Sequence, residues 1–189
     1  MEATVKNTTF PMEDFAIPRP AADEYAPYYK GYIDQVPEGP FLEMLRGTGE
    51  EFSALLEGIP REKWNHRYAP GKWSVRDVVQ HVIDTERVMA YRLLRLSRGD
   101  STPLPGFDQD TYAEAARVGN RRPQSFVDEF RALRESNLYL IGNLQPDQLE
   151  LKGRASDQPV SVRALAYILA GHLLHHHRLL REKYVAPAS

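Results

Sequence analysis

Apolar residues recur at helical spacing in four segments, and this pattern constrains the fold more than any other feature of the sequence. In the clearest segment, Val75, Val78 and Val82 are followed by Met89 and Leu93, which places all five on one face of a helix. No segment shows the apolar–polar alternation that is typical of a half-buried strand. Four helices joined by loops predict an all-α protein, a four-helix bundle.

Capping and stop residues place the ends of these helices. The first helix is expected from about Phe41 to Glu57, the second from an N-cap at Ser74 to a stop at Gly99, the third from Pro123 or just after Ser125 to Gly142, and the fourth from Ser161 to about Lys183. Ser74 and Ser161 suit helix starts, because a serine hydroxyl can accept a hydrogen bond from a free backbone N–H of the first turn. Residues 99–111, with Pro103 and Pro105, are expected to form a loop.

The beginning of the chain differs in composition from the rest. It is rich in proline and tyrosine, so we expect residues 1–39 to form an arm or cap that contains a short helix near Tyr28–Asp34. Residues 40–185 are expected to form the bundle. A chain of 189 residues corresponds to one domain and can bury a core without a covalent staple.

The charge balance and the missing residue types exclude several functional classes. The 24 basic and 26 acidic residues give a net charge of -2, which does not favour binding to nucleic acid. Arg117, Arg121 and Arg122 could form a local basic stripe, but a solvated loop is the simpler interpretation. The absence of cysteine excludes disulfides, thiolate metal sites and a cysteine nucleophile. No apolar run approaches the ~20 residues needed to span a bilayer, and the N-terminus lacks a signal-peptide pattern. We therefore expect a cytoplasmic protein without a membrane partner.

Histidines provide the strongest indication of a functional site. His81 lies in the second predicted helix, His172, His175, His176 and His177 lie in the fourth, and His66 lies in a loop where we expect it to be structural. His172 and His176 are four residues apart, so their imidazoles project from one face of the helix as two ligands of one metal usually do. His175 lies close to the same face, whereas His177 is rotated by roughly 100° from His176. His81 borders the apolar stripe of its own helix, where a metal shared with the pair would give it a partner.

From the residues alone, other interpretations of this cluster stay open. Histidines at the end of a helix can also be a simple polar terminus, because protonated imidazole is favourable beside the negative end of the helix dipole. Asp84 and Glu86 lie near His81 in the sequence. Asp84, one turn from His81, could orient the His81 ring or could instead form a surface ion pair with Arg87 or Arg92.

Three motifs resemble the DinB-like (DinB/YfiT) superfamily. They are Trp64 with Pro70–Asp77 and His81–Arg87, then Pro103–Asp108, and finally Gly171–His176, so that the resemblance covers about residues 40–183. It implies a four-helix bundle that binds a divalent metal through His81, His172 and His176, and often a homodimer. Leu173 stands where the family usually has an acidic or amide residue, so no acid or base is carried over to that position.

Such a site would suit catalysis. Three neutral imidazoles leave at least one coordination position open, which is typical of catalytic rather than structural metal sites. Zinc and nickel both suit imidazole ligands. The open position could lower the pKa of a bound water molecule or bind a substrate anion. In an enzyme, we expect a pocket over the metal, lined by the loop around Phe107 and by the tyrosine-rich arm.

The resemblance also indicates a class of reaction. Some members of the superfamily are transferases or isomerases that depend on a low-molecular-weight thiol. A protein without cysteine would need an external thiol, and a metal would stabilise the reactive thiolate. We therefore expect a metal-dependent, thiol-dependent S-transferase that acts on a small molecule. A metal-dependent hydrolase and a non-enzymatic, stress-related metal-binding bundle stay open as alternatives.

Overall fold

The computed structural model describes residues 16–185, and it confirms the predicted four-helix bundle. The long helices are α2 (Phe41–Glu57), α3 (Val75–Ser97), α5 (Pro123–Gly142) and α7 (Val162–Leu179). Helix α2 has the predicted bounds. Helix α7 ends before the predicted Lys183, and a π-helical segment, η5 (Leu180–Val185), continues it. Residues 1–15 of the predicted arm lie outside the described residues.

Short elements connect and flank these helices. They are η1 (Ala22–Glu24), η2 (Pro27–Tyr29), α1 (Lys30–Ile33), η3 (Arg61–Asn65), α4 (Gln109–Ala115), η4 (Val118–Asn120), α6 (Pro146–Leu149), β1 (Lys152–Ala155) and β2 (Gln158–Ser161). The short helix expected near Tyr28–Asp34 is present as η2 followed by α1. The loop expected over residues 99–111 ends earlier than predicted, because Asp108 accepts a 2.7 Å hydrogen bond from the backbone N–H of Thr111 and caps α4.

A β-hairpin corrects the expectation that the chain contains no strands. Strands β1 and β2 pair antiparallel, and the turn between them consists of Ser156 and Asp157, both with positive φ. This is the backbone shape of a two-residue hairpin turn, for which glycine or asparagine is the usual signal. The strands were missed because each has four residues, too few to show an alternating pattern.

The predicted serine caps are confirmed. The Ser74 hydroxyl accepts a hydrogen bond from the backbone N–H of Asp77, and the Asp77 carboxylate accepts one in return from the backbone N–H of Ser74 at 2.9 Å. The Ser161 hydroxyl accepts a 3.0 Å bond from the backbone N–H of Ala164. These bonds satisfy donors that a helix start leaves free, so they fix where the two histidine-bearing helices begin.

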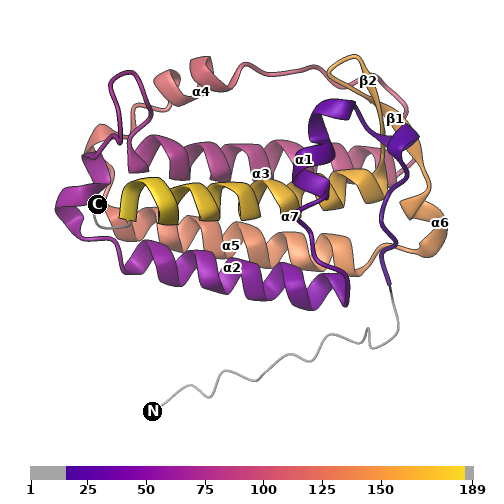
Figure 1. Ribbon diagram of the computed structural model, residues 1–189. Helices are drawn as coiled ribbons and strands as arrows, with labels where there is room; N and C mark the ends of the chain where they lie inside the picture. Colours follow the sequence, from indigo (N-terminus) through magenta and orange to yellow (C-terminus); the bar gives the residue numbers. More distant parts are fainter. Residues whose placement is uncertain (1–15, 186–189) are drawn as a thin grey trace, which may run out of the picture.

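The directions of the four long helices do not simply alternate along the chain (Figure 1). Residues 98–122 lead back along the bundle from the end of α3 to the start of α5, so α3 and α5 run in the same direction. Helices α2 and α7 run the opposite way. Helix α3 therefore packs antiparallel against α7, as α2 does against α5.

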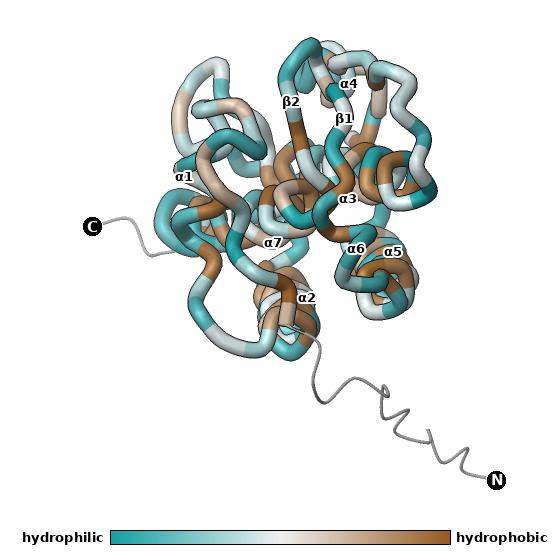
Figure 2. Tube along the Cα trace, turned by 90° about the vertical axis from the view of Figure 1, so that its right-hand side faces the viewer, coloured by the Kyte–Doolittle hydropathy of each residue, from teal (hydrophilic) through white to brown (hydrophobic). Residues whose placement is uncertain are grey.

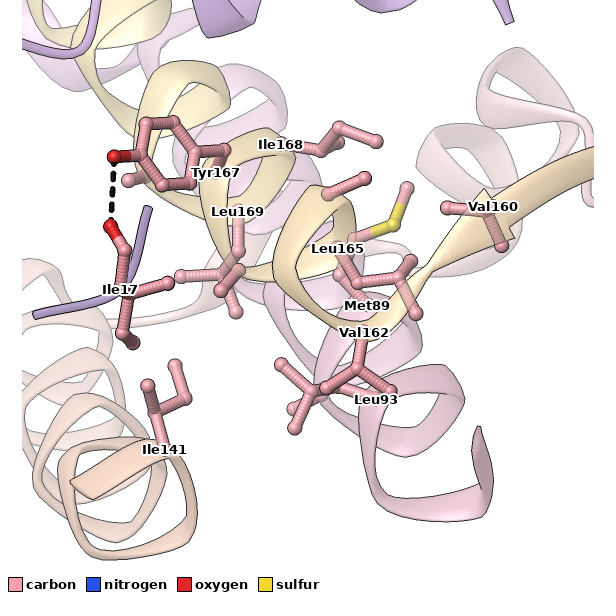
Figure 3. Close-up of a cluster of buried hydrophobic side chains, with 14 of the residues drawn as sticks. Ile17, Met89, Leu93, Ile141, Val160, Val162, Leu165, Tyr167, Ile168 and Leu169 are labelled. Atoms are coloured by element: carbon pink, nitrogen blue, oxygen red, sulfur yellow. Dashed lines mark hydrogen bonds between the residues drawn. The ribbon is translucent and has the colours of Figure 1, made fainter. Parts of the chain in front are cut away.

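The apolar core consists of two clusters of buried residues. Figure 2 looks along the helices and shows, in brown, where the hydrophobic residues lie along the trace. One buried cluster, drawn in Figure 3, joins Leu93 of α3, Ile141 of α5 and Leu165 of α7. A second cluster, at the other end of the helices, is built around Phe52, Trp64 and Phe126 and adds residues from α3 and α7. No described helix has an apolar stretch long enough to cross a membrane.

The described part of the arm packs on α7. Ile17, Ile33 and Val36 are buried in the first core cluster, and the Tyr167 hydroxyl donates a 3.0 Å hydrogen bond to the carbonyl of Ile17 (Figure 3). Arg163 of α7 forms a two-pronged ion pair with Glu24. Helix α1 consequently lies across α7.

Candidate metal centre

Three histidines from two helices meet inside the bundle. His81 of α3 and His172 and His176 of α7, here called the histidine triad, each offer a ring nitrogen, and these nitrogens all lie within 4.8 Å of one another. The Nε2 atoms of His81 and His172 are 3.0 Å apart. The ring centroids of the triad are 4.5 to 4.9 Å apart. The structure therefore brings together the three residues that the sequence singled out.

Helix geometry explains this convergence. The four-residue spacing of His172 and His176 places both rings on the face of α7 that contacts α3. His81 lies early in α3 and His176 late in α7, and these positions coincide because the two helices run antiparallel.

The triad is buried, and burial favours the neutral form of its imidazoles. Each of the three residues is 6–7% exposed. Burial lowers the pKa of His81 to about 4, with a further contribution from the nearby charge of His175. Burial, assisted by the neighbouring histidines, also lowers the pKa of His172 and His176 well below the usual value. Neutral rings keep the lone pairs that a metal requires.

These residues fit a divalent metal ion. His176 Nδ1 is the one buried side-chain nitrogen or oxygen in the described part of the chain that has no hydrogen-bond partner. Such an atom costs on the order of 1–3 kcal/mol, so native structures seldom leave one without a role. Three converging neutral imidazoles are also the donor set of many catalytic zinc sites.

Thr85, rather than Asp84, lies behind the triad. The Thr85 hydroxyl is 3.4 Å from Nδ1 of His81, one turn along α3, and Thr85 is buried. Asp84 instead accepts a 2.9 Å hydrogen bond from Gln80 and lies 4.0 Å from Arg87. The alternative of a surface pair with Arg87 is therefore the correct one for Asp84. The spacing of four residues between His81 and Thr85 was the available signal in the sequence.

Aromatic rings from two different segments of the chain lie against histidines of the site. Trp73, just before α3, has its ring centroid 4.8 Å from that of His81. Tyr32 of α1 lies 5.5 Å from His172 and 5.4 Å from His175, again between ring centroids. The tyrosine-rich arm thus reaches the candidate site, as expected. The contacts of Phe107 are with Tyr112 and Arg92 instead.

The remaining candidates have other surroundings. The His177 ring packs against Phe52, and the His66 ring packs against Tyr184, so neither joins the triad. Arg121, part of the suggested basic stripe, donates a 2.7 Å hydrogen bond to Gln80 and also pairs with Glu129. The donors of Arg121 are therefore engaged within the protein.

A solved structure with the same fold is YfiT from Bacillus subtilis, described as a probable metal-dependent hydrolase with an unusual four-helix bundle topology. Its TM-score is 0.67 at 17% sequence identity, with 77% of this chain and 91% of YfiT covered. A mycothiol-dependent maleylpyruvate isomerase matches with a TM-score of 0.65 at 12% identity, over 83% of this chain and 64% of the isomerase. At these identities the likeness establishes the fold.

Sequence comparison agrees with the structural likeness. A protein of Oceanobacillus iheyensis, provisionally named a metal-dependent hydrolase, is 24% identical over 138 residues, which cover 72% of this chain and 79% of that protein. The family model of the DinB superfamily matches residues 44–180, which include the whole histidine triad. The chain belongs to the DinB superfamily.

Proposed function

We propose that the histidine triad binds one divalent metal ion, zinc or nickel, and that the protein is a metal-dependent enzyme whose co-substrate is a low-molecular-weight thiol. The observation that carries this proposal is the convergence of three neutral, buried imidazoles, one of them with an unpaired nitrogen. When bound, the ion would act as a Lewis acid that stabilises an anionic ligand.

The charge of the site favours an anionic ligand. The triad contributes no negative charge, so a divalent ion held there would keep its full charge. The two acidic residues next to the triad on α3 are engaged elsewhere, since Glu86 pairs with Arg134 and Asp84 interacts with Gln80 and Arg87. A thiolate would supply the missing negative charge.

The composition supports an external thiol. The chain has no cysteine, so a sulfur nucleophile must come from another molecule. The isomerase with the same fold is described as mycothiol-dependent, which gives a precedent for such a co-substrate on this architecture. We infer an S-transfer reaction between a thiol and a small electrophile.

Hydrolysis is the second candidate. It is favoured by the names of two similar proteins, one of Oceanobacillus iheyensis and one of Bacillus subtilis, both given as metal-dependent hydrolases. A site that stabilises a thiolate would also lower the pKa of a water molecule. The two reactions differ in whether turnover needs a thiol.

Metal content is the first test. Protein purified without a nickel column should contain about one zinc or nickel ion per chain, and His81→Ala should lose it. His66→Ala is the matched control, because His66 is an exposed histidine outside the triad. Equal metal content in His81→Ala and the wild type would show that the triad is not the site.

Turnover is the second test. The metal-loaded protein should convert an electrophile such as chlorodinitrobenzene with glutathione, mycothiol or bacillithiol, and His176→Ala should not. Metal-dependent turnover of an ester or amide without thiol would identify the hydrolase instead. Metal binding without turnover on either panel would favour a non-enzymatic metal-binding role.

A further inference from the structure

A series of ring contacts connects an exposed tyrosine with the buried triad. Tyr28 is 71% exposed, its ring packs against that of Tyr32 at 6.1 Å between centroids, and Tyr32 is half-buried against His172. Trp73 is also half-buried and contacts His81. Aromatic surface therefore borders the two histidines whose Nε2 atoms lie 3.0 Å apart.

Tyr32 is held in place by contacts that a mobile cap would not have. A Cβ atom on Gly171 would lie 2.1 Å from the carbonyl oxygen of Tyr32, so the close approach of α1 to α7 requires glycine there. Arg19 donates hydrogen bonds to the carbonyls of Ile33 and Val36 at 2.7 and 2.6 Å, which fix the end of α1. A ring fixed by its surroundings can position a ligand, since little conformational freedom is lost on binding.

We propose that Tyr32 is a substrate-positioning residue and that, together with Trp73, it selects a substrate with a planar apolar group, such as an aromatic ring, next to its metal-binding atom. The inference rests on the proposed metal site. Aromatic side chains favour such groups because edge and face contacts between rings add about 0.5–1.5 kcal/mol to area burial.

Tyr32 belongs to the N-terminal arm, so the proposed selectivity would depend on the arm as well as on the bundle. The match to the family model begins at residue 44, so Tyr32 lies outside the matched residues, whereas the triad and Trp73 lie among them. The metal ligands would then belong to the common bundle, and one side of the substrate site would belong to the arm. Members of the family with different arms would accept different substrates.

A pair of hydroxamates tests the proposal without requiring turnover. Acetohydroxamate and benzohydroxamate offer the same metal-binding group and differ in carrying a methyl or a phenyl group. The protein is loaded with Co²⁺, whose visible absorption reports the ligand set, and each hydroxamate is titrated into it. We expect benzohydroxamate to bind about 3- to 10-fold more tightly than acetohydroxamate.

Variants assign this preference to Tyr32. Tyr32→Leu should reduce the preference for benzohydroxamate to less than half of its wild-type value, with Trp73 supplying the remainder, and acetohydroxamate should bind as it does to the wild type. Tyr32→Phe should keep the preference because it keeps the ring. Tyr91→Leu is the matched control, since Tyr91 is an exposed tyrosine on α3, ten residues beyond His81. Unchanged helical circular dichroism and Co²⁺ absorption show that each variant is folded and loaded.

Each outcome bears on the proposal. Equal affinity for the two hydroxamates in the wild type, or a preference that Tyr32→Leu leaves at more than half of its wild-type value, overturns the role of Tyr32 while the metal site stands. If Tyr32→Leu does not fold, loss of the preference in Trp73→Leu supports the aromatic site, and its retention there overturns it. Absence of Co²⁺ absorption that depends on His81 overturns the metal site, and the inference fails with it.

Discussion

Helix α3 contributes to two buried polar clusters that differ in how completely they are satisfied. At Glu86, the carboxylate accepts two hydrogen bonds from Arg134, at 2.8 and 2.7 Å, and one from Asn137 at 3.1 Å. Arg134 also donates to the carbonyl of Leu45 at 3.1 Å. At the histidine triad, three like groups face one another and one nitrogen has no partner.

The difference separates a structural cluster from a functional one. Glu86 and Arg134 carry opposite charges, and the Asn137 amide donates to the same carboxylate. The main hydrogen bonds of this ion pair are therefore formed inside the protein. Gly49 of α2 assists, because a Cβ atom there would lie 3.0 Å from the Arg134 side chain. The triad has bonding capacity left over, and a metal ion would use it. Buried polar groups with unused capacity are therefore better markers of a site than buried charge alone.

The largest effect is expected from breaking the ion pair. Glu86→Ala leaves the Arg134 guanidinium buried without its counter-charge, which should lower the free energy of unfolding by about 3–5 kcal/mol. Urea denaturation at neutral pH in the presence of a chelator measures this loss. The double variant Glu86→Leu, Arg134→Met should recover most of it, because the buried charges are then removed together. A loss below about 1 kcal/mol in Glu86→Ala would contradict a structural role for the pair.

A substitution in the triad, unlike Glu86→Ala, should change stability little without metal and should abolish the stabilisation by metal. His176→Leu removes the unpaired nitrogen and replaces the imidazole with an apolar side chain, so with a chelator present its stability should stay within about 1 kcal/mol of the wild type. With free metal at 100 times the dissociation constant, the wild type should gain about 2.7 kcal/mol and His176→Leu should gain none. Thermal unfolding with and without metal separates the two conditions. Loss of helical circular dichroism in the wild type at 25 °C with chelator would show that the core depends on metal.

Without metal, stability should fall as the pH is lowered, in two adjoining ranges. The folded-state pKa of His81, lowered by burial, is about 4, below its usual 6.5. The unfolded chain therefore takes up this proton first, and stability is lost as the pH falls from about 6.5 to about 4. At Glu24, burial opposes ionisation but hydrogen bonds from Arg163 outweigh it, and the pKa is lowered to about 2. Stability from Glu24 should be lost between about pH 4.5 and 2.

Variants assign each range to its group. The pH dependence of the urea midpoint should lose part of its upper step in His81→Leu and part of its lower step in Glu24→Gln, because the pKa values of Asp100 and Glu129 are lowered as well. An unchanged upper step in His81→Leu would mean that the triad does not control stability in that range.

Local patterns in the sequence were sufficient to predict the four long helices, and together with the family resemblance they predicted the triad. Apolar periodicity and the caps at Ser74 and Ser161 define α3 and α7. The four-residue spacing of His172 and His176 places both on one face of α7. The third ligand, His81, could be identified because it borders an apolar stripe and because its motif resembles a family. These are features that neighbouring residues determine.

The features that were missed depend on distant partners. Glu86 belongs to a polar-looking stretch of sequence, and its burial requires Arg134, which is 48 residues away. The contact of Tyr32 with His172 depends on Gly171 and on the docking of the arm. Strands β1 and β2 stabilise each other and have no strong individual pattern. Such pairings involve tertiary packing, which periodicity does not encode.

The smallest effect, on metal affinity, is expected at Thr85. Like Asn137 beside Glu86, Thr85 is a polar neighbour that can form a hydrogen bond with a buried group, here His81. Its hydroxyl lies 3.4 Å from His81 Nδ1, at the long end of the range for a hydrogen bond. Groups that orient metal-bound histidines typically contribute about 10–100-fold in affinity, so this longer contact should contribute about tenfold or less. Thr85→Val keeps the shape and removes the hydroxyl, and competition with a chelator should show weaker metal binding. Thr85→Ser should bind metal as the wild type does, because it keeps the oxygen. Equal affinity in Thr85→Val and Thr85→Ser would mean that packing alone orients the His81 ring.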